Sequence, residues 1–293
     1  MPQPQHNGID IDRLMVPPGS AIAIADYDPD YTGNLTKGEA KTALSDSITR
    51  LAALQDKLYA QNIYALLVIF QAMDAAGKDS TIKHVMSGLN PQGCQVFSFK
   101  QPSSEELDHD YLWRSFKALP ERGRIGIFNR SYYEEVLVVR VHPELLQRQQ
   151  LPPDAIGDGI WAQRFEEINN FEQYLVNNGV VVLKFFLNVS KEEQRQRFLK
   201  RINRPEKNWK FSVSDARERA YWDEYMAAYG DAITHTNTSC APWHIIPADH
   251  KWFSRLAVAT IIEAKLRSLN LAYPEVGPDH QQRLQQAKAM LEP

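Results

Sequence analysis

The stretch Ala65-Leu-Leu-Val-Ile-Phe-Gln-Ala-Met-Asp-Ala-Ala-Gly-Lys-Asp-Ser80 decides the fold. Its first six residues are apolar and predict a buried strand, and a helical pattern follows the Gly-Lys pair. A Gly-Lys pair between a strand and a helix predicts a phosphate-binding loop, because backbone N–H groups and the helix N-terminus surround a polyphosphate there. Lys78 would place its charge on the outer phosphates, so it is our first candidate for catalysis.

The loop departs from the usual phosphate-loop pattern at three positions. Ala72 stands where the first glycine is expected, Asp79 follows the lysine where a magnesium-binding Ser or Thr is usual, and Ser80 comes one residue later. Asp74 can compensate, since its carboxylate can coordinate a metal directly or through water. We therefore expect metal binding and catalysis by Asp74, and phosphate binding by the rest of the loop: Ala75, Ala76, Gly77, Asp79 and Ser80.

The composition limits the class of protein. A chain of 293 residues suits one enlarged α/β domain. The net charge of -3 gives no general attraction to nucleic acid or membranes, so any basic site must be local. Cys94 and Cys240 lack disulfide or zinc spacing. No apolar run reaches the roughly 18 residues of a membrane span. We expect a cytoplasmic protein in a reducing environment.

Five short apolar runs are each followed by a polar loop and a helical pattern, which predicts a parallel sheet. They are residues 65–70, 95–99, 124–128, 180–187 and 243–246. Loops at the carboxyl ends of such strands build the site. Capping-box spacings predict a first helix that begins at Thr36 and Glu39, and another helix from Leu107 to Leu119 after Ser103 and Glu106.

Three regions are expected along the chain. Residues 1–35, rich in Pro, Gly and Asp, would form an extended arm over the domain or between subunits, with a disordered tail as the alternative. Residues 36–270 would form the phosphate-loop domain. Residues 271–293 would form a C-terminal tail with an exposed helix end.

The third run ends in Asn129-Arg-Ser-Tyr-Tyr-Glu-Glu135, at a position where nucleotide-handling folds often place an acidic residue for magnesium. Asn129 can bond a metal-bound water or a phosphate oxygen but brings no charge, so Asp74 and Glu134 or Glu135 must supply anionic ligands. Arg130 is placed to pair with a phosphate through two hydrogen bonds. The alternative is a strand end followed by an exposed charged helix.

A basic run extends from Arg195 to Lys210 with a single acid inside it. Arg197, Lys200, Arg201 and Arg204 have the spacing of one helix face, and we expect the apolar Phe198, Leu199 and Ile202 to turn toward the core. Like charges on one helix face repel, and a bound polyanion would relieve that repulsion. The alternative is an ordinary solvated face.

The basic run continues past the end of its helix. Pro205 ends the helix, and a loop with Trp209 follows, which suggests a mobile lid over bound phosphates. The next helical stripe, Trp222, Tyr225, Met226 and Tyr229, is interpreted as packing.

Several blocks in order resemble the polyphosphate kinase 2 family, bacterial P-loop enzymes that move phosphoryl groups between inorganic polyphosphate and nucleotides. The likeness runs from about Asp28 to Leu269 and is most specific at 73–79, 86–93, 128–132, 204–212 and 243–249. It implies a P-loop kinase-like three-layer α/β sandwich, with a central parallel sheet of about five strands and a helical lid at about residues 195–230.

The resemblance also implies roles for particular residues. Asp74 and Lys78 would act in the phosphate loop, and Asn129 and Arg130 would occupy the second nucleoside-triphosphatase motif. Basic residues of the lid would border a polyphosphate channel: Arg197, Lys200, Arg201, Arg204, Lys207 and Lys210. The string from Glu134 to Pro143 resembles class III, whose members phosphorylate both AMP and ADP, so Glu134 or Glu135 is a candidate for orienting metal or acceptor.

The expected cofactor is Mg²⁺, with Mn²⁺ as an alternative because hard oxygen ligands accept both. The expected partners are inorganic polyphosphate and adenine nucleotides, without nucleic acid or a membrane, in a homo-oligomer that is a dimer or a tetramer.

Two rival functions remain open. One is an ATP-dependent nucleoside or nucleoside-monophosphate kinase, which leaves the long basic run unexplained. The other is a non-catalytic module that binds single-stranded nucleic acid through the basic helix and Trp209, which gives Lys78 and Asp74 no role.

Overall fold

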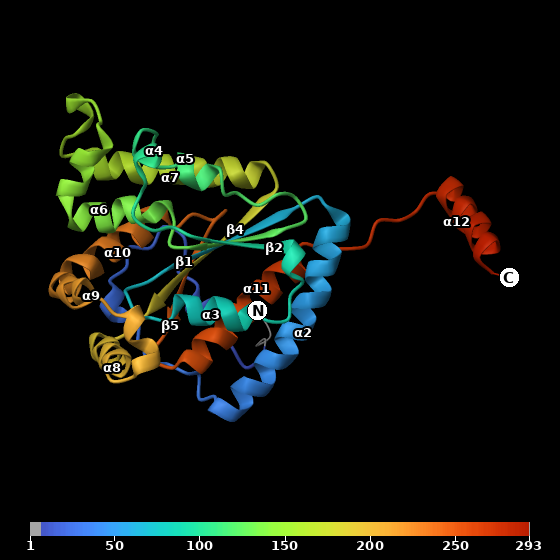
Figure 1. Cartoon of the computed structure of the whole chain (residues 1–293), viewed down its shortest axis with the longest axis horizontal. Coiled ribbons are helices and arrows are strands. Elements are labelled where there is room, and N and C mark those ends of the chain that lie inside the picture. Colours follow the sequence, from blue (N-terminus) through green and yellow to red (C-terminus); the bar gives the residue numbers. More distant parts are fainter. Residues whose placement is uncertain (1–6, 293) are drawn as a thin grey trace.

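The computed structural model describes residues 7–292 and confirms the predicted parallel sheet (Figure 1). Its five strands are β1 (Ala65–Gln71), β2 (Cys94–Ser98), β3 (Ile125–Asn129), β4 (Val180–Asn188) and β5 (Trp243–Pro247). All neighbouring strands pair in parallel, in the order β2-β3-β1-β4-β5. The central strand is β1, so the loop that follows it lies in the middle of the sheet's carboxyl edge.

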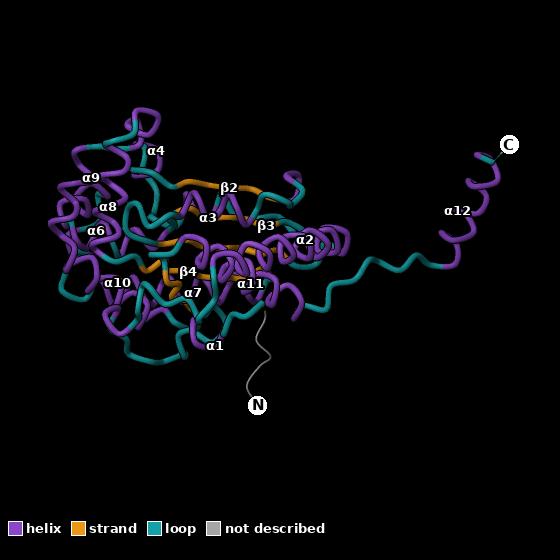
Figure 2. The backbone as a smooth tube through the Cα atoms, turned by 90° about the horizontal axis from the view of Figure 1, so that it is seen from below, coloured by secondary structure: helices purple, strands orange, loops and turns teal. Residues whose placement is uncertain are grey.

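Helices flank the sheet on both sides and complete a three-layer sandwich, as Figures 1 and 2 show. On one side α2 (Lys37–Gln61), α3 (Lys78–Val85) and α11 (Lys251–Ser268) pack together. On the other side lie α7 (Ile160–Asn177) and α10 (Trp222–Thr236). Every residue of β1 is buried, as expected for a parallel strand covered on both faces.

Two of the expected helices have different outcomes. The first helix, α2, begins at the predicted capping box, in which Thr36 and Glu39 bond each other's backbone N–H groups. The continuous helix expected from Leu107 to Leu119 is wrong, because the structure has two short helices, α4 (Ser104–Leu107) and α5 (Trp113–Phe116). The Asp110 carboxylate accepts a hydrogen bond from the Leu112 N–H at 2.9 Å and stabilises a turn between them.

Residues 7–35 pack against the sandwich and include α1 (Ile11–Leu14) and the 3-10 helix η1 (Ile24–Asp26). The Val16 N–H donates to the Trp243 carbonyl at 2.9 Å, and Met15 forms an antiparallel bridge with His244. This segment therefore covers the outer edge of β5, an edge that would otherwise present unpaired backbone groups. The first six residues of the expected arm lie outside the described residues.

The remaining elements are short or peripheral. They are η2 (Pro91–Gly93), η3 (Tyr132–Val136), α6 (Val138–Val141), η4 (Pro143–Gln149), η5 (Pro153–Ala155), α8 (Lys191–Ile202), η6 (Pro205–Lys210), α9 (Val213–Glu218), η7 (Arg219–Tyr221) and α12 (Pro278–Leu291). In both views α12 stands apart from the sandwich at the end of an extended segment, and all of its residues are exposed. Within residues 7–292, none of the helices combines the length and apolar character needed to cross a membrane.

Candidate active site

The loop between β1 and α3 bends sharply around two left-handed residues. Ala75 has φ 61° and Gly77 has φ 116°, a backbone conformation that glycine adopts at little cost. Lys78 is the first residue of α3. The N-terminus of α3, with its unpaired N–H groups, therefore opens directly onto the loop, which is the arrangement that binds phosphate in other proteins.

The Lys78 side chain lies inside this loop rather than in solvent. It is 8% exposed, and its ammonium donates to the Ala72 carbonyl at 2.7 Å. Burial, followed by the nearby Arg130 charge, lowers the pKa of Lys78 to about 8. A bound phosphate would favour the charged form of this lysine and so strengthen its own binding.

Arg130 joins the phosphate loop to the third strand. Its φ is 66°, and its backbone N–H donates to the Phe70 carbonyl at 3.0 Å. Its guanidinium lies 2.7 Å from Asp74 Oδ1 and 3.3 Å from Glu134 Oε2, and the latter carboxylate helps to raise the Arg130 pKa. The side chains expected to act together therefore do lie together.

Asn129 and Ser80 are held by polar partners near the loop. The Asn129 amide donates to Asp79 Oδ1 at 2.8 Å. The Ser80 hydroxyl accepts from the Arg255 guanidinium at 2.7 Å. Asn129, at the end of β3, therefore contacts the residue that follows Lys78, and Ser80 is bonded to α11, so each is engaged with another side chain in this structure.

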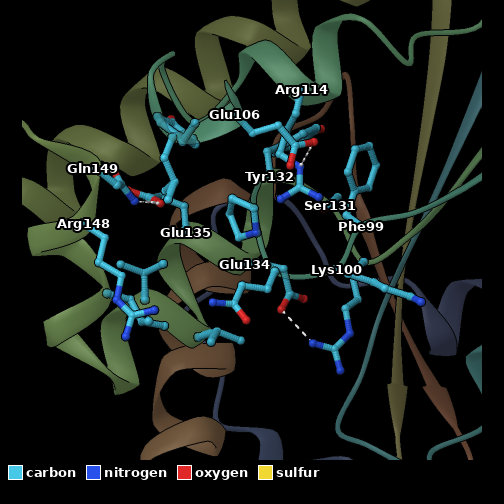
Figure 3. A pocket seen from close by; sticks show the side chains of 18 of the residues that line it. Phe99, Lys100, Glu106, Arg114, Ser131, Tyr132, Glu134, Glu135, Arg148 and Gln149 are labelled. Atoms are coloured by element: carbon cyan, nitrogen blue, oxygen red, sulfur yellow. Dashed lines mark hydrogen bonds and ion pairs between the residues drawn. The ribbon is translucent and has the colours of Figure 1, made fainter. Parts of the chain in front are cut away.

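Two cavities meet at Arg130 and Glu134, and both are also lined by Val138 and Leu145. One has a volume of about 580 Å³ and lies between η3 and the segment from Phe99 to Arg114 (Figure 3). The other, of about 500 Å³, extends from Asp74 toward Tyr225 on α10. An arginine at the junction of two cavities is suited to hold a group that passes from one substrate to another.

Glu134 and Glu135 have different environments despite being neighbours. Glu135 is 5% exposed and accepts a hydrogen bond from Arg164 at 3.1 Å. It accepts another from Gln149 at 2.6 Å, as Figure 3 shows. Burial raises the pKa of Glu135. Glu135 thus ties η3 to α7 and η4, whereas Glu134 contacts Arg130.

A buried polar cluster supports the segment that carries Arg130 and Glu134. Lys184 on β4 is fully buried and donates to Glu172 at 2.6 Å and to the Tyr133 hydroxyl at 2.9 Å. The hydroxyls of Tyr132 and Tyr133 both donate to Glu172, at 2.9 and 2.8 Å. The start of η3 is therefore fixed to the sheet and to α7.

Arg197 differs from the other basic residues expected to border a polyphosphate channel, because its side chain is enclosed by the protein. Arg197 is 4% exposed, and its guanidinium donates to the carbonyls of Ala75 at 3.0 Å, Ala76 at 2.6 Å, Ala248 at 2.6 Å and Asp249 at 3.0 Å. Its Nε donates to Glu193 at 2.7 Å. This arginine fastens the phosphate loop to the loop after β5, with its donors turned to the backbone.

The rest of the basic run lies at the surface of the expected lid. Arg201 and Lys207 are partly buried, and the other members, Lys200, Arg204 and Lys210, are exposed. The expectation that Leu199 and Ile202 turn inward is wrong, because they are 43% and 44% exposed and only Phe198 is buried. The side of α8 that faces the domain carries Gln194, Arg197, Phe198 and the partly buried Arg201, and Leu199 and Ile202 lie on its outer side.

Gln194 was missed by the sequence analysis. It is buried, and its amide donates to the Asp74 carbonyl at 3.0 Å. Tyr225 and Tyr229 were assigned to packing and are indeed buried, but they also line the second cavity. The sequence contains no signal for these residues, because a neutral amide side chain and an aromatic helix stripe occur both in functional sites and in ordinary hydrophobic cores.

The acids near the loop suit a hard divalent metal. Asp74 and Glu134 line the second cavity with side chains 33% and 24% exposed. No group of three or more His, Cys, Asp or Glu residues within 7–292 could by itself hold a metal ion.

Comparison with known proteins shows the same family throughout. The family model described as Polyphosphate kinase 2 matches residues 34–273. An ADP-polyphosphate phosphotransferase of Rhodopseudomonas palustris is 54% identical over 249 residues, 85% of this chain and 86% of that protein. An AMP/ADP-polyphosphate phosphotransferase of Meiothermus ruber is 43% identical over 265 residues, 90% of this chain and 95% of that protein. The crystal structure of Polyphosphate Kinase 2 from Arthrobacter aurescens TC1 superposes with a TM-score of 0.85 at 39% identity, covering 93% of this chain and 95% of that one.

Proposed function

We propose, given that the chain belongs to the polyphosphate kinase 2 family, that it transfers phosphoryl groups between inorganic polyphosphate and the adenine nucleotides AMP and ADP. The observation that carries the proposal is the position of Arg130. Its guanidinium is held by Asp74 and Glu134 where two cavities meet, next to a phosphate loop. Two substrates and one transferred group require such an arrangement.

Different residues would bind the phosphates and align the transferred group. The loop backbone and Lys78 would hold phosphates, and Arg130 would align the transferred phosphoryl group and neutralise its charge. An acceptor phosphate is already an anion near neutral pH, so no general base is needed, and catalysis consists mainly of positioning and charge neutralisation for in-line transfer. Glu134 is the better candidate of the glutamate pair, because it pairs with Arg130 while Glu135 is tied to Arg164.

Enzymes of this family generally depend on a divalent metal. Asp74 and Glu134 would hold Mg²⁺, or Mn²⁺ as the alternative, and the ion would neutralise charge on the phosphate oxygens. Because Asp74 also pairs with Arg130, its carboxylate would serve both to bind the metal and to position the arginine.

The test is to incubate the protein with long-chain polyphosphate and Mg²⁺ and to offer AMP, ADP, GMP and GDP separately, with chromatography of the products. Lys78→Ala should abolish product formation. Lys83→Ala is the matched control, because Lys83 lies on the same helix and is exposed. Product in wild type and control but not in Lys78→Ala supports the proposal, and absence of product with every acceptor refutes it.

The choice between AMP and ADP is a finer part of the proposal. The two relatives named above differ, one being named for ADP and the other for both AMP and ADP. We propose the dual specificity of class III. ATP formed from ADP alone would keep the family activity and refute dual specificity.

An ATP-dependent nucleotide kinase is the nearest rival function. Such an enzyme would transfer the label from labelled ATP to the acceptor, and added polyphosphate would act on this transfer only as a competing inhibitor. A nucleic-acid binding module would instead retain an oligonucleotide and transfer no phosphoryl group.

Other expectations are part of the same proposal. The protein would be cytoplasmic and a dimer or tetramer, with an arm at residues 1–35, a lid at 195–230 and a tail at 271–293. Light scattering measures the oligomer, and limited proteolysis with and without polyphosphate tests whether the lid becomes protected.

A further inference from the structure

Two basic residues of α11 lie beside the phosphate loop and belong to neither cavity described above. Lys251 is the first residue of α11, and its Cε lies 3.9 Å from the position that a Cβ would take on Gly77. Arg255, one turn later, donates to the Ser80 hydroxyl at 2.7 Å. The segment from Gly77 to Ser80 is therefore flanked by cations from a helix outside the basic run.

The charges around Lys251 are mostly positive. Burial first, and then the charges of Arg197, Arg255 and Arg201, lower the pKa of Lys251 to about 8. Glu193 acts in the opposite direction, but it is already paired with Arg197 at 2.7 Å. The N-terminal end of the α11 dipole adds further positive potential at Lys251.

Repulsion between these neighbouring cations destabilises the protein when no ligand is bound, and a bound anion would relieve this repulsion. Arg197 is committed to backbone carbonyls and cannot turn outward. Arg201 on the lid has a side chain 27% exposed, contacts the Lys210 carbonyl at 3.3 Å and Asp215 at 3.9 Å, and lies close enough for its charge to lower the Lys251 pKa. The cations with capacity for a ligand are therefore Lys251 and Arg255 on α11 and Arg201 on the lid.

We propose that Lys251 and Arg255, together with Arg201, bind the polyphosphate chain at a distance from its reacting end. The identity of the anion rests on the proposed function. The reacting end lies at Lys78 and Arg130, and the chain continues past Gly77 between α11 and the lid. Figure 1 shows α3, α8 and α11 on the same side of the sheet, where this path would run. The expected consequence is selection for donor length, because a long chain extends farther along this path than tripolyphosphate does.

The test compares two donors in one variant and its control. Lys251→Met keeps much of the apolar stem and removes the charge. Lys265→Met removes the same charge from the same helix near its other end. With ADP saturating, Lys251→Met should raise KM for long-chain polyphosphate about tenfold, the effect of one charge-assisted contact, and leave KM for tripolyphosphate and kcat within about twofold. Lys265→Met should change neither KM.

Arg255→Gln provides a second variant, since glutamine can still donate to Ser80 but carries no charge. It should show the same split between the two donors. An equal rise of KM for both donors, or no change for either, overturns the proposal.

An equilibrium measurement keeps this result separate from the proposed function. Labelled long-chain polyphosphate is titrated with each variant in the absence of nucleotide. If wild type forms no product with any acceptor, the proposed function fails, and this titration still decides the cluster. Weaker binding by Lys251→Met than by Lys265→Met supports it, and equal binding refutes it.

Discussion

Replacing Arg197 by methionine should destabilise the fold, rather than merely weaken polyphosphate binding. The guanidinium makes four bonds to backbone carbonyls of two loops and one to Glu193, in a position 4% exposed. Methionine fills much of the same space and satisfies none of these acceptors. The two loops would then be held together only by their own weaker contacts.

The size of the loss follows from these contacts. A hydrogen bond to a charged group contributes about 1.5–3 kcal/mol, but several bonds from one side chain do not add. Removing one partner of a buried ionic group costs about 3–5 kcal/mol, and we expect Arg197→Met to lie in this range. Arg201→Met should cost at most about 1 kcal/mol, since its ion pair with Asp215 spans 3.9 Å near the surface.

Urea unfolding followed by tryptophan fluorescence measures both values, and Arg197→Lys gives an intermediate case in which the charge is kept but fewer carbonyls are reached. Kinetics should show the reverse order, with Arg201→Met raising KM for polyphosphate while stability is unchanged. The reasoning is refuted if Arg197→Met unfolds at the wild-type urea concentration and loses only affinity for polyphosphate.

Other perturbations separate catalytic from structural groups. Because the pKa of Lys78 is lowered to about 8, the free enzyme loses the charge of this lysine above that pH. The value of kcat/KM for polyphosphate should therefore fall above about pH 8, both in wild type and in Lys251→Met. Profiles of rate against pH measure this fall. Glu134→Gln should lower kcat and change the free energy of unfolding by less than about 1 kcal/mol. Glu135→Ala should lower the free energy of unfolding by about 3 kcal/mol, because it leaves Arg164 without a buried partner. Calorimetry and initial rates measure these effects, and the same behaviour in both variants would contradict the assignment. Lys184→Met leaves a buried carboxylate without its cation and should cost about 3–5 kcal/mol in urea unfolding, and a cost below 1 kcal/mol would contradict the ion pair.

The strands were predictable because each one is a buried apolar run between polar loops. The five predicted runs correspond to β1 to β5, and the loop between β1 and α3 followed from the Gly-Lys pair. A parallel order then places Asn129 and Arg130 next to the loop, since the ends of β1 and β3 are neighbours. The sequence pattern of the phosphate loop and the geometry of the parallel sheet therefore both locate the candidate site at the carboxyl edge of the sheet.

The basic run was only partly predictable, because the spacing of residues on a helix does not show which side of the helix packs against the domain. Arg197 and Arg201 share a face of α8, yet the first is enclosed by the loops after β1 and β5 and the second borders the surface. Leu199 and Ile202 lie on the outer side of α8 and are exposed. Only the three-dimensional path of α8 distinguishes these residues.

The glutamate pair could not be resolved from the sequence for a related reason. Glu134 and Glu135 are adjacent in a 3-10 helix, which turns successive side chains by about a third of a circle. One carboxylate therefore meets Arg130 and the other meets Arg164. Lys251 was overlooked because its partners come from β1–α3 and α8, far away in the chain.

The detached helix α12 has a practical consequence. None of its residues is buried, and Figure 1 shows it at the opposite end of the molecule from α8 and α9. A probe or surface tether attached along α12 would therefore hold the molecule with its phosphate loop facing the solution. Deleting the helix would remove none of the buried core. The helix α12 is therefore suitable both for attaching the protein to a surface and for truncating the chain without loss of core packing.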